Sequence, residues 1–268
     1  MSGITFVVDA PFQRGTVVRD DIRISSGTIL LIEPARDGLD GIPSSLRNYA
    51  RGEFLESSGI DVPSITCVDT LSSVAGCLVE RTSKGGIHGV VATGAFGSHA
   101  GRFRFAAVTP TTVLQYIVDN PDHSYYFGMI GRVTRNAATS ANTVGLGGIA
   151  PIDGEDQSTT SVIGVAQAVS NQNIVGRPAT TNNFFINRRT VPGDGVPYFC
   201  DSAVSGHQVP NVETFSTARA EFFTMGERSA SSTASGHPSH IVYSCWLEDL
   251  TVSGRSYSEA SAEGLAVF

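Results

Sequence analysis

Acidic side chains form two short clusters that could carry out chemistry. Asp153, Glu155 and Asp156 lie in a glycine-containing stretch, and Glu248 and Asp249 end an apolar run. Cleavage of a glycosidic bond usually needs two carboxyl groups held roughly 5–10 Å apart. No Glu-x-Asp-x-x-Glu strand motif, which would present carboxylates on one face, occurs in the sequence. We therefore expect both clusters to be solvated, one in a loop and one at a strand end, and we predict no catalytic residue.

The first acidic cluster is also the best candidate for a metal site. Asp153, Glu155 and Asp156 could supply the loop oxygens that Ca²⁺ prefers, although the twelve-residue helix-loop-helix template is absent. His237 and His240 could bind zinc, but zinc needs further His, Cys or carboxylate ligands, and the surrounding sequence offers no such cluster. We expect a turn leading into a strand at the histidines, and no cofactor apart from the calcium alternative.

Signatures of other reactions are absent. The stretch 94–101 has small residues around Ser98 but lacks the Gly-x-Ser-x-Gly spacing of a nucleophilic serine, and no glycine-rich phosphate loop occurs. The formal net charge is −7. Binding to a phosphate backbone needs clustered Lys and Arg, so nucleic acid is not expected as a partner. We predict that the chain is not an enzyme and that it acts by presenting a surface to a partner.

Aromatic and amide side chains are the candidates for that surface. Sugar rings stack their C–H faces on amphipathic aromatic rings, while their hydroxyls bond to polar side chains. Tyr125, Tyr126 and Phe127 follow one another on an expected strand, so their side chains alternate between two faces, and an exposed tyrosine could contact a glycan or a protein. The segment 180–189 is a second candidate, with packing between subunits as an equal alternative. Its candidate residues are Asn182, Asn183, Arg188 and Arg189.

Short strands are the elements expected to position these residues. The 268-residue chain is 41% hydrophobic and only 16% charged, with 29 glycines, which suits strands and tight turns better than a helical bundle. Apolar or alternating runs recur about every 8–20 residues, as in a sandwich or jelly roll. These runs lie at 27–33, 64–81, 87–93, 101–105, 125–134, 161–169, 184–191 and 239–249.

Two segments are expected to be helical. In 109–120, Pro110 occupies the favoured first turn, an apolar stripe follows, and Pro121 ends the helix. The segment 44–57 has apolar residues at helical spacing, although Gly52 disfavours a helix there by about 1 kcal/mol. We expect the first helix to lie across a sheet or to cover its open end.

The chain is expected to form one domain. All-β sandwiches of this size routinely fold as single units. We assign residues 1–26 to an N-terminal arm or first strand and residues 27–268 to a single β-sandwich domain. Trp246, the sole tryptophan, is expected in the core. The four cysteines form no Cys-x-x-Cys pair and are interpreted as reduced core thiols. They are Cys67, Cys77, Cys200 and Cys245.

The N-terminal sequence indicates where the protein is made. Residues 1–9 lack the basic and apolar regions of a signal peptide, and no stretch approaches the ~20 apolar residues of a membrane span. We therefore expect the protein to be made in the cytoplasm and to leave it only as part of an assembly.

Three segments carry a resemblance to a known family. The segments 27–35, 125–135 and 246–257 resemble proteins encoded in the tail modules of tailed bacteriophages and prophages. The resemblance covers most of the chain from Gly27 onward and includes no catalytic signature. It implies a mainly β fold, a concanavalin-like (LamG-like) jelly-roll β-sandwich with one or two short helices, mounted on the virion tail.

The resemblance leads to three ordered hypotheses for function. The first is a virion structural protein of the tail, baseplate or tail fibre, made in the host cytoplasm, which docks as symmetric copies onto other tail proteins. The second is a receptor-facing, lectin-like module that holds a host-surface glycan. The third is a glycan hydrolase or lyase, which two carboxylates converging in a cleft would favour.

Overall fold

The computed structural model describes most of the chain in several ranges. They are 21–38, 40–92, 103–135, 143–149, 163–168, 173–178, 184–187, 197–207, 212, 221–226 and 238–268. The strands are β1 Thr28–Ile32, β2 Ser45–Arg47, β3 Ser64–Asp69, β4 Leu78–Arg81, β5 Ile87–Val90, β6 Arg104–Val108, β7 Ser124–Arg135, β8 Thr143–Ile149, β9 Ile163–Ala168, β10 Asn173–Pro178, β11 Phe184–Asn187, β12 Pro197–Ser205, β13 Glu221–Gly226 and β14 Ser239–Asp249. The α-helices are α1 Arg51–Ser58, α2 Thr111–Asp119, α4 Leu250–Ser253 and α5 Tyr257–Val267, with 3₁₀ turns η1 Pro34–Asp37 and η2 Leu71–Ser73.

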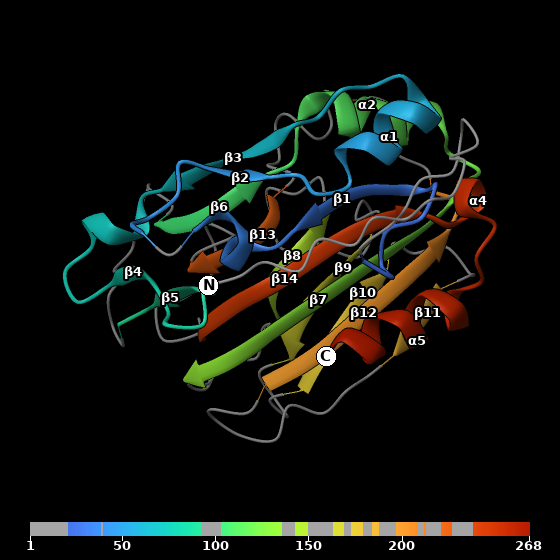
Figure 1. Cartoon of the computed structure of the whole chain (residues 1–268). Coiled ribbons are helices and arrows are strands. Elements are labelled where there is room, and N and C mark those ends of the chain that lie inside the picture. Colours follow the sequence, from blue (N-terminus) through green and yellow to red (C-terminus); the bar gives the residue numbers. More distant parts are fainter. Residues whose placement is uncertain are drawn as a thin grey trace, which may run out of the picture.

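The strands form two antiparallel sheets that face each other (Figure 1). Sheet A has the order β11-β12-β7-β14-β5-β4, and β1 also pairs with β14. Sheet B has the order β10-β9-β8-β13-β6-β3-β2. The predicted mainly β, jelly-roll sandwich is therefore confirmed. The described residues contain four α-helices, which is more than the one or two expected.

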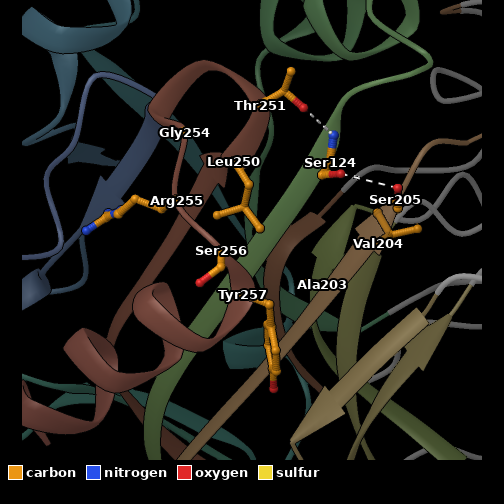
Figure 2. Close-up of a pocket in the computed structure, with 10 residues that line it drawn as sticks. All are labelled: Ser124, Ala203, Val204, Ser205, Leu250, Thr251, Gly254, Arg255, Ser256 and Tyr257. Atoms are coloured by element: carbon orange, nitrogen blue, oxygen red, sulfur yellow. Dashed lines mark hydrogen bonds between the residues drawn. The ribbon is translucent and has the colours of Figure 1, made fainter.

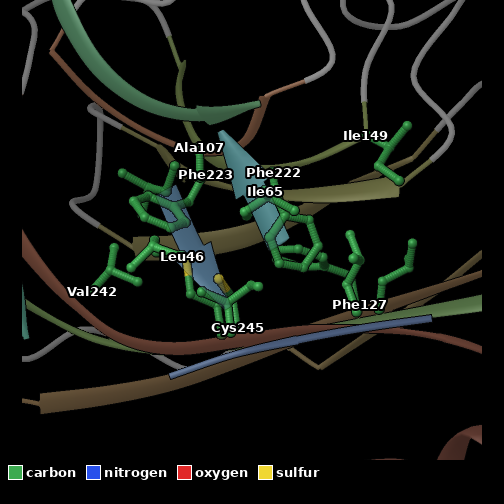
Figure 3. Close-up of a cluster of buried hydrophobic side chains, with 14 of the residues drawn as sticks. Leu46, Ile65, Ala107, Phe127, Ile149, Phe222, Phe223, Val242 and Cys245 are labelled. Atoms are coloured by element: carbon green, nitrogen blue, oxygen red, sulfur yellow. The ribbon is translucent and has the colours of Figure 1, made fainter. Parts of the chain in front are cut away.

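A hydrophobic core fills the space between the two sheets (Figure 3). Phe127 of sheet A meets Phe222 of sheet B edge to face, with ring centroids 5.4 Å apart at 82°. Cys245 and Cys200 are buried in the same core, as predicted, whereas Cys67 and Cys77 are only partly buried against it. Burial of this apolar area supplies the main driving force for joining the sheets.

A second apolar cluster lies on the outer face of sheet A. Trp246 is 1% exposed and stacks on Phe199 with centroids 5.9 Å apart and planes 2° from parallel, so the prediction that Trp246 is in the core is confirmed. Helix α5 lies over the outer face of sheet A (Figure 1), and its residues Ala260 and Tyr257 pack in the same cluster as both rings. A Cβ placed on Gly264 of α5 would lie 2.7 Å from Phe199 and 2.8 Å from Trp246, so a glycine is needed where the helix meets the rings.

The Trp246 ring packs directly against the backbone of Gly128 in β7, which leaves no space for a side chain there. A Cβ at Gly128 would lie 2.3 Å from Cζ2 of Trp246. We expect Gly128→Ala to lower the free energy of unfolding by about 1–3 kcal/mol through overpacking. Gly52→Ala is the control, because nothing lies within 4 Å of a Cβ there and alanine should stabilise α1 by about 0.5–1 kcal/mol. Urea unfolding would measure the stability of both variants. A Gly128→Ala protein as stable as the native chain would contradict the prediction.

Local structure agrees with the sequence in some segments and differs in others. The helix expected at 109–120 is α2, with Pro110 at its N-cap. The segment 44–57 instead divides into strand β2 and helix α1. The β4–β5 hairpin turns at Gly85, whose φ of 81° favours glycine. In the described part of the chain, no helix is long and apolar enough to cross a membrane.

The structure describes only the last part of the segment 1–26 that was predicted to be an arm or first strand. Residues 1–20, most of the predicted arm or first strand, lie outside the described residues. Residues 21–26 form turns that lead into β1. The Arg23 guanidinium in this segment lies 5.4 Å from the ring centroid of Trp246. The start of the described chain is therefore packed onto the outer face of sheet A.

Candidate functional site

The two tyrosines predicted to contact a ligand are buried. Tyr125 and Tyr126 are both 0% exposed, so the expectation of an exposed tyrosine on this strand is wrong. They point to opposite faces of β7, as predicted, but both faces are covered: Tyr125 lies in the core between the sheets and Tyr126 in the cluster under α5. The Tyr126 hydroxyl donates to Oδ2 of Asp201 at 2.9 Å. Burial first, and then Asp201, raises the pKa of Tyr126 well above its usual value.

Several predicted candidates lie outside the described residues. The contact candidates in this group are Asn182, Asn183, Arg188 and Arg189, and the calcium candidates are Asp153, Glu155 and Asp156. His237 is also in this group, whereas His240 belongs to β14 and not to a turn before it. Over the described ranges, no group of three or more His, Cys, Asp or Glu side chains is arranged to hold a metal.

The acidic pair at the end of β14 is not solvated, which corrects the sequence-based expectation. Glu248 and Asp249 are both 0% exposed. Successive strand residues point to opposite faces, so the two carboxylates diverge and do not form a catalytic pair. The chain turns back over them as α4 and α5, and this reversal removes the solvent that a strand end usually meets.

Glu248 faces the outer side of sheet A and is fully bonded. It accepts hydrogen bonds from Nε and Nη2 of Arg255, both at 2.7 Å, and from the Ser25 hydroxyl at 2.8 Å. Bidentate contacts of this kind are among the stronger hydrogen bonds in proteins. Glu248 therefore links the described N-terminal segment to the turn before α5.

Asp249 is bonded at the end of the sandwich. Its Oδ1 accepts from the backbone N–H groups of Thr251 and Val252 and so caps α4. Its Oδ2 accepts from the Tyr116 hydroxyl at 2.8 Å and lies 2.6 Å from Nδ1 of His123. Because both carboxylate oxygens are occupied by these contacts, we assign Asp249 a structural role: it links α2 and the start of β7 to α4.

A pocket opens between the ends of β7 and β12 and the turn that joins α4 to α5 (Figure 2). Its volume is about 400 Å³, near the lower end of the range typical of small-molecule sites. Gly254, with φ of 70°, ends α4 in the left-handed conformation that allows this turn. The lining residues are Ser124, Ala203, Val204, Ser205, Leu250, Thr251, Gly254, Arg255, Ser256 and Tyr257.

The pocket combines buried apolar lining with hydroxyl groups. Ala203 and Leu250 are buried lining residues, whereas Ser205 and Thr251 are exposed. Thr251 Oγ1 accepts from the backbone N–H of Ser124 at 2.9 Å, and the hydroxyls of Ser124 and Ser205 lie 3.3 Å apart, as Figure 2 shows. A hydroxyl can both donate and accept, so Thr251 and Ser205 retain hydrogen-bonding positions for a ligand.

Tyr257 forms one wall of the pocket at the start of α5. Its hydroxyl donates to Oδ1 of Asp201 at 3.2 Å, and its ring lies 6.0 Å from that of Tyr126. Burial, together with Asp201, raises the Tyr257 pKa, so the side chain is a neutral phenol at physiological pH. The half-buried ring is fixed by these contacts and offers an aromatic surface.

Only indirect signals in the sequence point to this pocket. Its residues come from three separate parts of the chain, so no local motif contains them. The Ser256-x-x-Glu259 spacing is a capping box, and the structure has both of its hydrogen bonds. That signal could have located the start of α5. The segment 246–257, singled out only by resemblance, contains six pocket residues: Leu250, Thr251, Gly254, Arg255, Ser256 and Tyr257.

Fold and pocket together define a two-sheet β-sandwich with a small pocket of mixed apolar and hydroxyl lining at one end. No family model matches the sequence, and a search of curated proteins finds no relative. Among solved structures, the chain is similar to a Trypanosoma rangeli sialidase in complex with 2,3-difluorosialic acid (8% identity, TM-score 0.49), covering 91% of this chain and 33% of the sialidase. A second structure of that sialidase, with 2,3-difluoro-KDN, gives 10% identity, a TM-score of 0.46, and coverages of 93% and 35%.

A bacterial toxin is also similar. Botulinum neurotoxin type C, described with two ganglioside molecules, is 7% identical with a TM-score of 0.45; 91% of this chain and 52% of the toxin chain are covered. The chain thus spans about a third of the sialidase chains and about half of the toxin chain. The prediction that the chain is not an enzyme is contradicted by the sialidase matches, because they place an enzyme among its neighbours. Similarity at this level assigns no reaction or substrate to this chain.

Proposed function

We propose that this chain is a saccharide-binding module of a phage virion tail and that it holds its ligand in the pocket at the α4–α5 turn. The observation that carries the proposal is the lining of the pocket, in which buried apolar side chains adjoin exposed hydroxyls. A sugar ring has the same two characters, since its C–H groups are apolar and its rim bears hydroxyls. Sites of this kind bury an apolar face and fix orientation with a few polar groups.

The family resemblance supports the virion part of the proposal. The three segments that carry it are far apart in sequence but adjacent in sheet A, where β14 pairs with both β1 and β7. The last segment, 246–257, also contributes most of the pocket wall. The other two segments line no part of the pocket and form the strands β1 and β7 that flank β14, so the resemblance includes both the pocket wall and the sheet that supports it. We propose other tail or baseplate proteins and further copies of this chain as its partners.

Blocking the pocket provides the test of binding. The purified chain is screened on an array of neutral and acidic glycans, and hits are titrated by calorimetry. We expect Ser205→Trp, which places an indole over the opening, to weaken binding at least about tenfold, equal to about 1.4 kcal/mol. Ser45→Trp is the control, because Ser45 is exposed on β2 of sheet B. A blank array, or equal binding by both variants, would contradict the proposal.

The virion placement has a separate test. Electron microscopy of intact particles carrying a tagged copy of the chain is expected to show density at the tail in a symmetric ring or fibre. Density at a capsid vertex would overturn the placement while leaving the saccharide-binding proposal intact.

A further inference from the structure

We infer that the pocket selects neutral saccharides and discriminates against sugars that bear a carboxylate, such as sialic and uronic acids. This inference rests on the saccharide-binding function proposed above and specifies its substrate class. It follows from the state of Arg255, the one cationic side chain among the pocket-lining residues.

Every nitrogen of the Arg255 guanidinium already has an acceptor. Nε and Nη2 donate to the two oxygens of Glu248 at 2.7 Å each, and Nη2 also donates to the backbone oxygen of Arg23 at 3.2 Å. Nη1 donates to the backbone oxygen of Ile22 at 3.3 Å and pairs with Oε2 of Glu263. Figure 2 shows the side chain directed away from Ser124, Ser205 and Tyr257. The guanidinium is therefore a structural clamp with no free donor turned to a ligand.

The charges around the α4–α5 turn are negative in sum. Arg255 is paired with two carboxylates, Glu248 and Glu263, and a third, Glu259, accepts from the backbone N–H and hydroxyl of Ser256 at the pocket lining. The Ser256 hydrogen bonds lower the pKa of Glu259, so this carboxylate is ionised at neutral pH. An anionic sugar entering the pocket would lose hydration and meet these carboxylates without gaining a cationic partner, which is unfavourable.

A neutral sugar carries no charge to be desolvated or to be repelled by these carboxylates. The polar side-chain atoms that the pocket offers are hydroxyls, which bond equally well to the hydroxyls of an uncharged sugar. Leu250 and Ala203 can contact the C–H face of the ring. The lining is thus complementary to a neutral hexose or to an N-acetylated sugar.

Matched glycans test this selectivity in the full chain. The probes are neutral oligosaccharides and the same oligosaccharides capped with sialic acid, on one array and then in calorimetry. We expect the capped forms to bind at least about tenfold more weakly. Binding to capped forms in preference to neutral ones would overturn the inference and leave saccharide binding standing, whereas binding to neither would overturn the proposed function itself.

A charge variant tests the mechanism of selection. Glu263→Gln removes one of the two carboxylates that neutralise Arg255, at a side chain that is 35% exposed. We expect this variant to bind sialylated probes several-fold more tightly than the native chain and to bind neutral probes unchanged. Glu56→Gln, at an exposed residue of α1, is the matched control and should change neither. If Glu263→Gln leaves the ratio of sialylated to neutral binding unaltered, the charge argument is wrong.

Discussion

Replacing Glu248 with alanine is expected to lower the free energy of unfolding by about 3–5 kcal/mol, the usual loss when one partner of a buried ion pair is removed. Glu248 is fully buried and accepts from Arg255 and Ser25. Without it, Arg255, whose side chain is 15% exposed, keeps its Glu263 partner but loses its bidentate acceptor. The contacts that hold residues 22 and 23 against the turn before α5 are weakened at the same time. Chemical unfolding at pH 7 measures the effect.

An exposed ion pair provides the control for this prediction. Arg51 and Asp61 are joined by two hydrogen bonds, but their side chains are 53% and 46% exposed. Solvent screens such pairs, so Asp61→Ala is expected to cause little loss of stability. A double variant, Glu248→Met with Arg255→Met, is expected to recover much of the loss, because no fully buried charge is left unpaired and Glu263, which is 35% exposed, can be solvated. A Glu248→Ala protein as stable as the native chain would contradict the assigned role of the pair.

Mild acid is expected to destabilise the protein through His240. This residue is 1% exposed, and neither ring nitrogen makes a hydrogen bond of standard geometry, although the backbone of Pro238 lies close enough to oppose the lowering of the pKa. Burial, with the nearby His88 as a smaller cause, lowers the pKa of His240 to about 3. An unfolded histidine has a pKa of about 6.5, so between these values the unfolded chain binds a proton that the folded chain does not. The contribution of His240 to stability is therefore complete above pH 6.5 and falls as the pH decreases.

The size of the effect follows from linkage. Each pH unit between about 6.5 and about 3 corresponds to about 1.4 kcal/mol, so we expect a loss of about 2 kcal/mol at pH 5 relative to neutral pH. His240→Leu removes this dependence and the buried polar atoms, and it is expected to stabilise the protein at pH 7 by about 1–3 kcal/mol. Urea unfolding of both proteins at pH 7, 6 and 5 gives the difference in slope. Burial also lowers the pKa of His207, but that contribution is common to both proteins and cancels. Parallel pH profiles for the two proteins would show that His240 is not the cause.

Periodic patterns predicted the elements well where the local pattern and the tertiary environment agree. The two prolines around α2 and the glycine turn of the β4–β5 hairpin act locally, through fixed φ angles or missing N–H groups, so they were readable in the sequence. Trp246 was readable as a core residue because large aromatic side chains gain most from burial. The C-terminal helices were missed, although the Ser256-x-x-Glu259 spacing indicated the start of one.

Exposure was the property that the sequence predicted least well. An acidic pair at the end of a strand and a run of three aromatic residues both suggested contact with solvent on at least one side. Glu248 is buried because Arg255 neutralises it, and Tyr126 is buried because α5 covers the outer face of sheet A. Whether a strand face is exposed to water depends on segments that are remote in sequence. The amino-acid sequence alone does not show which of these segments cover that face.

The class of fold, the central strands and the positions of the main turns were therefore predictable from the amino-acid sequence, because side-chain alternation and backbone restrictions operate over a few residues. Which charged and aromatic side chains are buried, and where a pocket opens, became clear from the folded chain. Ser124, Ser205 and Thr251 become neighbours through the pairing of β7 with β12 and β14 and the reversal of the chain at α4. This difference arises because burial and site geometry depend on long-range contacts between segments, whereas strand and turn propensities depend on short-range ones.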